Sequence, residues 1–376
     1  MTPHILFYVQ HLLGIGHVQR AATITRALVR NDVNVTVVLG GPAVPLADFG
    51  GADIRQLPSV RAADSSFKLL VDEYGNAIGD DWRDNRRREL MRVYEDVNPD
   101  LFLIELFPFG RYQFRFELLP LLEEINHKIP VVCSVRDVLV RSNKPDRDQK
   151  ITSIIDDYFD HILVHGDENL ISLESTFPIA RQFSNKLTYT GYVTEEKLAE
   201  APLSLGADEV IVSAGSGAVG ENLLRIAMAA RSLSKLSHKP WRFLAGDYLP
   251  EPVFKELQSS APEGVCIERA REDFRALLPN ALLSISQGGY NTVMDVLSAK
   301  CPAVIVPFAD GDEGEQTFRA RKLAKTGLLH MLEADALSAE TLADVINAAI
   351  SIKSAASIDF DMSGAETTAR LIRNMT

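Results

Sequence analysis

A histidine follows a pair of glycines near the amino terminus, in the segment QHLLGIGH, which ends at His17. An apolar run precedes this segment and a stretch with helical periodicity follows it, so His17 is expected in the first turn of a helix. The positive end of a helix dipole disfavours a charged imidazolium. We therefore predict that His17 stays neutral near pH 7 and can accept a proton from a reacting hydroxyl, with capping of the helix as the alternative role.

Two carboxylates offer alternative proton acceptors, because each comes at the end of an apolar run. Glu105 closes the run Leu101–Glu105, and Asp137 lies just past Val131–Val135. The loops that follow such strands carry the ligand sites of parallel α/β folds. Arg111 is close to Glu105 in the sequence, and Arg136 directly precedes Asp137. A structural ion pair with one of these arginines is the competing interpretation for either carboxylate.

The segment SQGGYNTVMD, from Ser286 to Asp295, is the strongest signal in the chain. A buried strand is predicted to end at Gly288 and Gly289, where a helix begins, and the amino terminus of that helix would face an anionic group such as a diphosphate. Asn291 and Asp295 are four residues apart and share one helix face. A carboxylate on that face can accept two hydrogen bonds from a sugar diol. A solvated aspartate on an ordinary amphipathic helix is the alternative.

Two further loops have the composition of ligand-binding loops. In AGSGAVG, residues 214–220, Gly215 and Gly217 let backbone amides approach an anion, and the Ser216 hydroxyl adds a donor. This loop is not a Walker A motif, because no Gly-Lys-Ser/Thr follows it. The loop ADGDEGEQ, residues 309–316, ends in Glu315 and Gln316. It can hold a polyol through hydrogen bonds or be a solvated or metal-binding loop, but its spacing is not that of an EF-hand.

Short apolar runs alternate with helical patterns along the chain, which is typical of a parallel α/β sheet. The expected strands are 5–9, 33–39, 101–105, 131–135, 161–164 and 187–190, followed by 209–213, 241–245, 265–268, 282–286 and 303–306. Two consecutive sets of strands predict two doubly wound domains rather than one large sheet. The junction is expected near Gly191–Leu205, where a strand ends and a polar segment containing proline begins.

Length and composition fit this organisation. The 376 residues are enough for two domains, and the formal net charge of −12 argues against a protein that coats nucleic acid. The three cysteines are far apart, so we expect small buried thiols in a reducing compartment rather than disulfides or a zinc site. No run is as long and apolar as a transmembrane helix, and the amino terminus lacks the basic region of a signal peptide, so a cytoplasmic protein is expected.

The segment Asp80–Arg92 carries five arginines, and several phenylalanines follow it between residues 107 and 116. This pairing would suit a lipid-linked or anionic acceptor, or a brief contact with an anionic membrane surface. Acidic residues lie among the arginines, however, so the favoured interpretation is a solvated helix with salt bridges on its surface. Some of the phenylalanines are then ordinary core residues.

The loop before His17 and the block Ser286–Gln316 resemble the GT-B glycosyltransferases, in particular the family 28 group typified by the lipid II N-acetylglucosaminyltransferase of peptidoglycan synthesis. The stretch Val9–Ala27, with ELFPFG at 105–110, is most similar to a bacterial group of predicted glycosyltransferases. The resemblance implies an α/β GT-B fold, with two doubly wound Rossmann-like domains facing across a cleft. Residues 1–195 would bind the acceptor and 205–355 the nucleotide sugar, and a helix within 356–376 would pack back on the first domain.

The resemblance also implies roles for individual residues. Those expected to bind the donor are Gly215, Ser216, Gly217, Arg271, Gln287, Gly288, Gly289, Asn291, Thr292, Asp295, Glu315 and Gln316. Gly14, Gly16 and Arg111 are expected on the acceptor side, and the catalytic candidates are His17, Glu105 and Asp137. Two positions depart from the family pattern: Asp295 stands where a glutamate holds the ribose, and Glu315 stands where a glutamine contacts the donor sugar.

The implied reaction is an inverting transfer of a sugar from a nucleotide diphosphate, with uridine as the expected base, to an acceptor hydroxyl. Helix amino termini can stabilise the leaving group, so no cofactor and no metal is expected. The expected partners are the nucleotide sugar and a sugar, lipid-linked or small-molecule acceptor, with at most peripheral membrane contact and no nucleic acid. The competing interpretations are a nucleotide-sugar hydrolase similar to that of pseudaminic acid biosynthesis and a sugar-nucleotide-binding protein without turnover.

Overall fold

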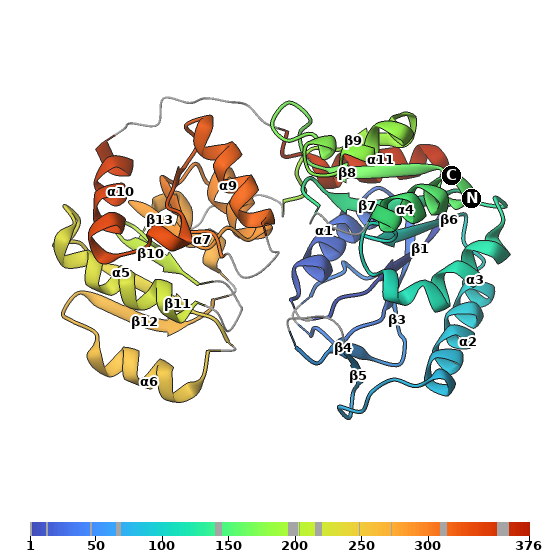
Figure 1. Ribbon diagram of the computed structural model, residues 1–376, viewed down its shortest axis with the longest axis horizontal. Helices are drawn as coiled ribbons and strands as arrows, with labels where there is room; N and C mark the ends of the chain where they lie inside the picture. Colours follow the sequence, from blue (N-terminus) through green and yellow to red (C-terminus); the bar gives the residue numbers. More distant parts are fainter. Residues whose placement is uncertain are drawn as a thin grey trace. The chain divides into compact units, whose positions relative to one another are not determined.

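The computed structural model describes residues 2–12, 14–45, 47–64, 69–139, 145–194, 202, 204–214, 220–247, 249–271, 273–308, 314–351 and 361–376. The chain divides into two compact units (Figure 1). The first consists of Met1–Glu195 with Asp361–Thr376, and the second of Glu196–Phe360. Each unit is an α/β sheet with its own core.

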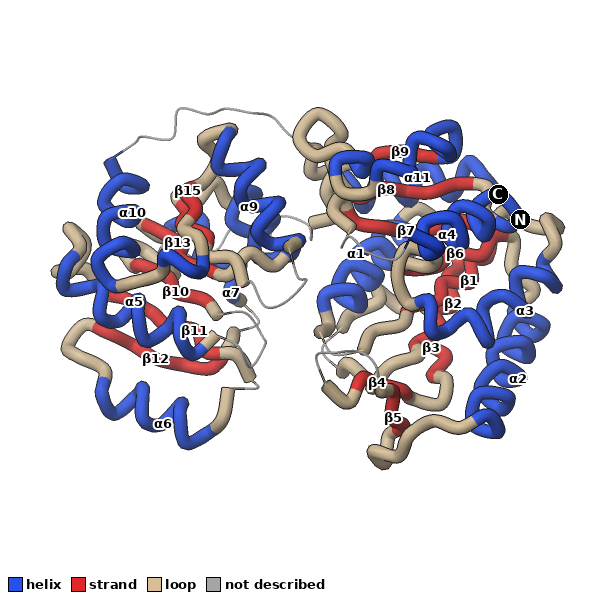
Figure 2. The backbone as a smooth tube through the Cα atoms, viewed as in Figure 1, coloured by secondary structure: helices blue, strands red, loops and turns tan. Residues whose placement is uncertain are grey.

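The first unit is built on a parallel sheet (Figure 2). Its strands are β1 (His4–Val9), β2 (Asn34–Leu39), β3 (Asp53–Gln56), β6 (Leu101–Glu105), β7 (Val131–Arg136), β8 (His161–His165) and β9 (Leu187–Tyr189). They lie in the order β3-β2-β1-β6-β7-β8-β9. A separate antiparallel pair consists of β4 (Val60–Ala62) and β5 (Leu70–Asp72).

Helices cover both faces of this sheet, because successive residues of its apolar strands point to opposite sides. The helices are α1 (Gly16–Arg30), α2 (Asp80–Val97), α3 (Arg115–Ile125), α4 (Pro145–Tyr158) and α11 (Gly364–Met375). Ile5 and Phe7 of β1 share a buried cluster with residues of α1 and α11. Leu6 and Tyr8, which alternate with them, share another with residues of α3 and α4.

Helix α11 belongs to the first unit although it ends the chain. Ala369 and Ile372 are fully buried in the cluster formed with α1. At the rim of this contact, Arg30 of α1 pairs with Glu366 over 2.6 Å.

The strand order in the first unit reverses between β1 and β6, which are neighbours in the sheet. Ligands of doubly wound sheets bind outside the carboxyl ends of the strands at such a point, because the two following loops diverge to opposite faces. The loop after β1 leads to His17, and the last residue of β6 is Glu105. The topology therefore brings together two of the predicted catalytic residues.

The second unit has the same plan with its own strands and helices. Its strands are β10 (Val210–Ser213), β11 (Trp241–Ala245), β12 (Val265–Arg269), β13 (Leu283–Ser286), β14 (Ala303–Ile305) and β15 (His330–Met331), in the parallel order β12-β11-β10-β13-β14-β15. Its helices are α5 (Glu221–Leu233), α6 (Glu251–Ser260), α7 (Phe274–Leu277), α8 (Tyr290–Ser298), α9 (Glu315–Lys325) and α10 (Ala339–Ser351). Here the order reverses between β10 and β13, so the turn after β13 lies at the equivalent position.

Every strand expected from the sequence is present to within two residues at each end, but β3, β4, β5 and β15 were not predicted. All four residues of β3 are exposed, and the other three are only two or three residues long, so none has a periodic apolar pattern. Cys133 and Cys301 are buried as expected. The same prediction was wrong for Cys266, which is exposed because β12 is an edge strand. In the described ranges, no helix is long and apolar enough to cross a membrane.

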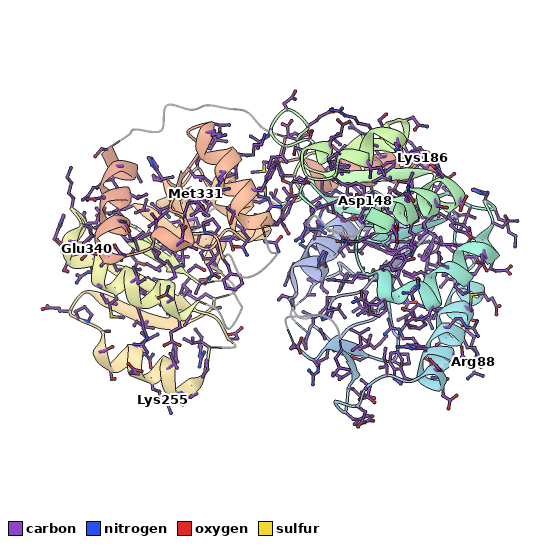
Figure 3. The ribbon with its side chains drawn as sticks, viewed as in Figure 1. Arg88, Asp148, Lys186, Lys255, Met331 and Glu340 are labelled. Carbon is purple, nitrogen blue, oxygen red and sulfur yellow. The ribbon has the colours of Figure 1, made fainter. Side chains whose placement is uncertain are left out.

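The arginine-rich segment forms α2, and most of it is the solvated helix that the charge pattern favours. Arg83 pairs with Asp80 and Arg87 with Asp84 on the surface, and Arg88 is exposed (Figure 3). Arg86 differs, because it is fully buried.

Candidate active site

His17 and Glu105 meet at the carboxyl ends of β1 and β6. His17 is the second residue of α1, and its Nδ1 lies 2.8 Å from Oε1 of Glu105. The side chain of His17 keeps 12% of its surface exposed, whereas that of Glu105 keeps none. His17 is therefore the member of the pair that can touch a substrate, and Glu105 is placed to hold its ring.

Arg20 completes this cluster from the next turn of α1. Its guanidinium donates to Oε1 of Glu105 and lies 3.1 Å from Nδ1 of His17. Burial alone would raise the pKa of Glu105, but the charge of Arg20 and the hydrogen bonds from His17 and Ser134 outweigh burial and hold the pKa well below its usual range. An ionised carboxylate only accepts hydrogen bonds. Nδ1 of His17 therefore carries the ring proton, which leaves the lone pair on Nε2.

Burial lowers the pKa of His17 to about 3, and the nearby charge of Arg111 lowers it further while Glu105 opposes the shift. His17 is accordingly neutral near pH 7. The sequence argument attributed this neutrality to the helix dipole, whereas in the structure burial is its largest cause.

The other residues predicted for this region are placed differently. Asp137 is fully buried, and the hydroxyl of Tyr192 lies 3.4 Å from its Oδ2. This carboxylate is covered in the structure, and the catalytic role of Asp137 stays a prediction. Glu105 forms an ion pair with Arg20 of α1, which is distant from it in the sequence.

Arg111 and the two glycines of the first loop lie around the same strand ends. Arg111 has a left-handed backbone, with φ of 60°, and its Nε donates to the carbonyl of Gln10 over 2.9 Å. Gly16 is the first residue of α1, and Gly14 is exposed just before it. A Cβ on Gly14 would meet nothing within 4 Å, so this loop is open at that point.

We expect three histidines of the first unit, two of them buried and His17 largely buried, to make this unit sensitive to mild acid. Burial lowers the pKa of His11 to about 4 and of His17 and His165 to about 3, against an unfolded value near 6.5. Below about pH 6.5 the unfolded chain binds more protons than the folded chain. The contribution of these histidines to stability is therefore fully present above about pH 6.5 and decreases as the pH drops below it. When the pH is lowered from 7.5 to 5.0, each histidine is expected to reduce the free energy of unfolding by about 2 kcal/mol.

Hydrogen exchange of peptides from β1 and β6 at the two pH values measures this loss directly. His165→Gln should remove about a third of the pH dependence, and the control His127→Asn, at an exposed position, should leave it unchanged. A first unit equally stable at pH 5.0 and 7.5 would contradict the assignment of buried neutral histidines.

In the second unit, Gln287, Gly288 and Gly289 connect β13 to α8, and Gly289 is the N-cap. In the described part of the chain, no side chain caps this helix, and the amino terminus of a helix favours an anion. Tyr290, Val293 and Leu297 are buried and form the apolar face of this helix. Asn291, Thr292 and Asp295 are half-buried.

Gly288 lies against the start of α9. A Cβ at this position would be 3.2 Å from Cβ of Gln316 and 3.3 Å from Cγ2 of Ile305, so a glycine permits the close approach. The side-chain oxygen of Gln316 accepts a hydrogen bond from the amide of Phe308 over 3.0 Å. The structure thus brings together two residues that the sequence argument assigned separately to the donor.

Arg319 links α9 to α8 a second time. Its guanidinium is fully buried, lies 5.2 Å from the ring centre of Tyr290 and donates to Glu315 over 2.8 Å. Glu315 is therefore held by an arginine of its own helix, and a bound sugar would have to share this carboxylate.

Two other predicted donor residues also have arginine or aspartate partners. Asp295 pairs with Arg275 of α7 over 2.8 Å, and each side chain is 16% exposed. Arg271 makes two hydrogen bonds of 2.7 Å to Asp273, so its guanidinium is engaged while its backbone follows β12. Gly215, Ser216 and Gly217 lie outside the described residues.

Sequence reasoning missed Arg20, Ser134 and Arg275. The spacing of three residues between His17 and Arg20 on one helix was an available signal. Ser134 and Arg275 had none, because they are distant in sequence from the groups that they contact. Over the residues that the structure describes, no three His, Cys, Asp or Glu side chains gather as a metal site would require.

Comparisons with known proteins bear on the family and the fold of the chain. Residues 259–372 match the family model described as the glycosyltransferase family 28 C-terminal domain. No curated protein has a sequence that matches the chain. The chain is therefore a glycosyltransferase with the GT-B fold that resembles family 28.

Solved structures show the same fold over the whole chain. MurG of Acinetobacter baumannii is 18% identical, with a TM-score of 0.64 and coverage of 99% of this chain and 100% of that one. The spinosyn rhamnosyltransferase SpnG complexed with thymidine diphosphate is 17% identical, with a TM-score of 0.65 and full coverage of both chains. LpCGTa in complex with UDP is 17% identical, with a TM-score of 0.62 and coverage of 100% and 96%.

Proposed function

We propose that this glycosyltransferase moves a sugar from a nucleoside diphosphate to an acceptor hydroxyl with inversion at the anomeric carbon. The observation that carries the proposal is the pair in which buried, ionised Glu105 holds Nδ1 of His17 at 2.8 Å. In this role His17 takes the proton of the acceptor hydroxyl at Nε2 as that oxygen attacks the anomeric carbon. Glu105 then stabilises the imidazolium that forms, and the nucleoside diphosphate leaves with the electron pair of the broken bond.

The second unit is proposed to bind the donor. Its family match and the TDP and UDP complexes of structurally similar proteins support a nucleoside diphosphate as the ligand, with uridine as the proposed base. The uncapped amino terminus of α8 offers N–H groups to the diphosphate, and this stabilisation is proposed to suffice without a metal or cofactor. The donor roles assigned to Gly215, Ser216, Gly217 and Arg271, and to Glu315 and Gln316, are part of the same proposal.

The first unit is proposed to bind the acceptor beside His17. Burial and the neighbouring charge of Arg136 lower the pKa of Arg111 to about 10, so an anionic group bound beside this guanidinium would be favoured. Its Nε is fixed by Gln10. We infer that its terminal N–H groups meet oxygen atoms of the acceptor, such as a phosphate, carboxylate or hydroxyl. The protein is proposed to act in the cytoplasm.

A panel of UDP-, TDP- and GDP-sugars tests the reaction class. A transferase should release the nucleoside diphosphate slowly by itself and faster when an acceptor extract is added, with the sugar recovered on an acceptor. Rapid release of free sugar without acceptor would instead identify a hydrolase. Binding without turnover in any extract would identify a sugar-nucleotide-binding protein.

Asp295→Ala is expected to weaken nucleoside diphosphate binding by about 1–3 kcal/mol, the value of a lost buried polar contact. Calorimetric titration with UDP, TDP and GDP measures this change. Arg275→Met is the matched control, because it removes the ion-pair partner of Asp295 but leaves the carboxylate for the ribose. If both variants bind as weakly as each other, the role of Asp295 is to hold Arg275 rather than the ligand.

A further inference from the structure

The hydrogen bonds around Glu105 continue away from His17 into the core. Oγ of Ser134 lies 2.6 Å from Oε2 of Glu105 and 2.8 Å from Nε2 of His165. Nδ1 of His165 lies 2.9 Å from Oγ1 of Thr190. These contacts form one unbroken chain from His17 to Thr190.

The strand order and register of the sheet bring these hydrogen-bonded residues together. Glu105 of β6 is directly opposite Ser134 of β7, His165 is the last residue of β8, and Thr190 follows β9. These four strands are consecutive neighbours in the sheet. Glu105 is 1% exposed and the other three residues are 0% exposed, so water does not compete for their hydrogen bonds.

The charge of Glu105 fixes the proton on each bond. An ionised carboxylate needs donors, so the single hydroxyl proton of Ser134 points to Oε2. Ser134 must then accept from Nε2–H of His165, and a neutral imidazole has no second N–H. Nδ1 of His165 is therefore an acceptor, and the hydroxyl of Thr190 donates to it.

We propose that Ser134, His165 and Thr190 are positioning residues for the reaction at His17. They hold Glu105 by Oε2, which presents Oε1 to Nδ1 of His17 and keeps the lone pair of Nε2 available to the acceptor hydroxyl. The catalytic part of this inference rests on the proposed function, whereas the proton positions do not.

The hydrogen bonds from Glu105 to Thr190 can also be donated in the opposite direction, which gives different proton positions. Oγ1 of Thr190 also lies 3.0 Å from the carbonyl of Gly191. If Thr190 donated there, His165 would carry its proton on Nδ1, and Ser134 would donate to His165. Oε2 of Glu105 would then lose its donor, and the chain would not hold the carboxylate.

Long-range ¹H–¹⁵N spectra of the imidazole rings distinguish the two directions in the protein without substrate. We expect the Nε2–H tautomer for His165 and the Nδ1–H tautomer for His17, assigned through His165→Gln and His17→Gln. His165 with its proton on Nδ1, or His17 with its proton on Nε2, would overturn the proposal. This test does not depend on knowing the acceptor.

A double-mutant cycle then tests the route through Glu105, with sugar release from the accepted donor as the assay. Ser134→Ala should lower kcat about 10-fold with little change in the donor KM, Ser134→Thr should restore it, and Ser134→Ala should cost less than about 2-fold when Glu105→Ala is already present. The control Ser284→Ala, at a fully buried serine of β13, should leave kcat unchanged. Equal losses in both backgrounds would show a structural role only. If no donor is turned over, the proposed function fails and the spectra still decide the proton positions.

Discussion

His17→Ala is expected to lower the rate of sugar transfer about 100- to 10,000-fold, the usual range for removal of a general base. The donor affinity should be nearly unchanged, because His17 belongs to the first unit and the donor is assigned to the second. Initial rates with the accepted donor, together with calorimetric binding of the nucleoside diphosphate, measure both quantities. The control His127→Asn replaces an exposed histidine of the same unit.

A His17→Ala enzyme within about 2-fold of the original rate would assign the base elsewhere. The pH profile gives a second check. Because the pKa of His17 is lowered to about 3, protonation of its ring should not reduce turnover between about pH 5.5 and 8, apart from loss of the folded first unit at the acid end.

Glu117→Ala should destabilise the first unit by about 3–5 kcal/mol, because it leaves the charge of Arg86 buried without its counterion. Nε of Arg86 lies 2.7 Å from Oε2 of Glu117, and both side chains are 0% exposed. Tyr8 also donates to this carboxylate, and Arg86 donates to Gln10 over 2.6 Å. The pair therefore ties α2 to α3 beneath the sheet.

Hydrogen exchange of peptides from β1 and β6 measures the free energy of opening of this unit. The control Arg83→Ala removes a surface arginine from the same helix and should change it by less than about 0.5 kcal/mol. The double variant Arg86→Met with Glu117→Leu should recover most of the loss, because no buried charge remains. A loss below about 1 kcal/mol for Glu117→Ala would show that water reaches Arg86.

The fold was largely predictable because its central strands are buried on both faces. Such strands are continuous apolar runs, and their lengths and spacing are visible in the sequence. Strand β3 was not predictable for the opposite reason, since its four residues, Asp53–Gln56, are polar or exposed and only pairing with β2 makes them a strand.

The candidate site was predictable where it depends on loops after strands. His17, Glu105 and the turn at Gly288 and Gly289 all follow from the rule that ligands bind at strand ends. Their partners did not follow from it.

The buried position of Arg86 was not predictable either. Arg86 has the same side chain as its neighbours Arg83 and Arg87, and only Glu117, on another helix, makes it a buried residue.

Hydrogen exchange in the presence of a nucleoside diphosphate tests the central claim most directly, because that claim assigns the donor diphosphate to the turn after β13. With saturating UDP, or with TDP or GDP if UDP does not bind, peptides that cover Gln287–Asp295 should gain protection. Protection confined to peptides of the first unit, or none with any of the three nucleotides, would contradict the account.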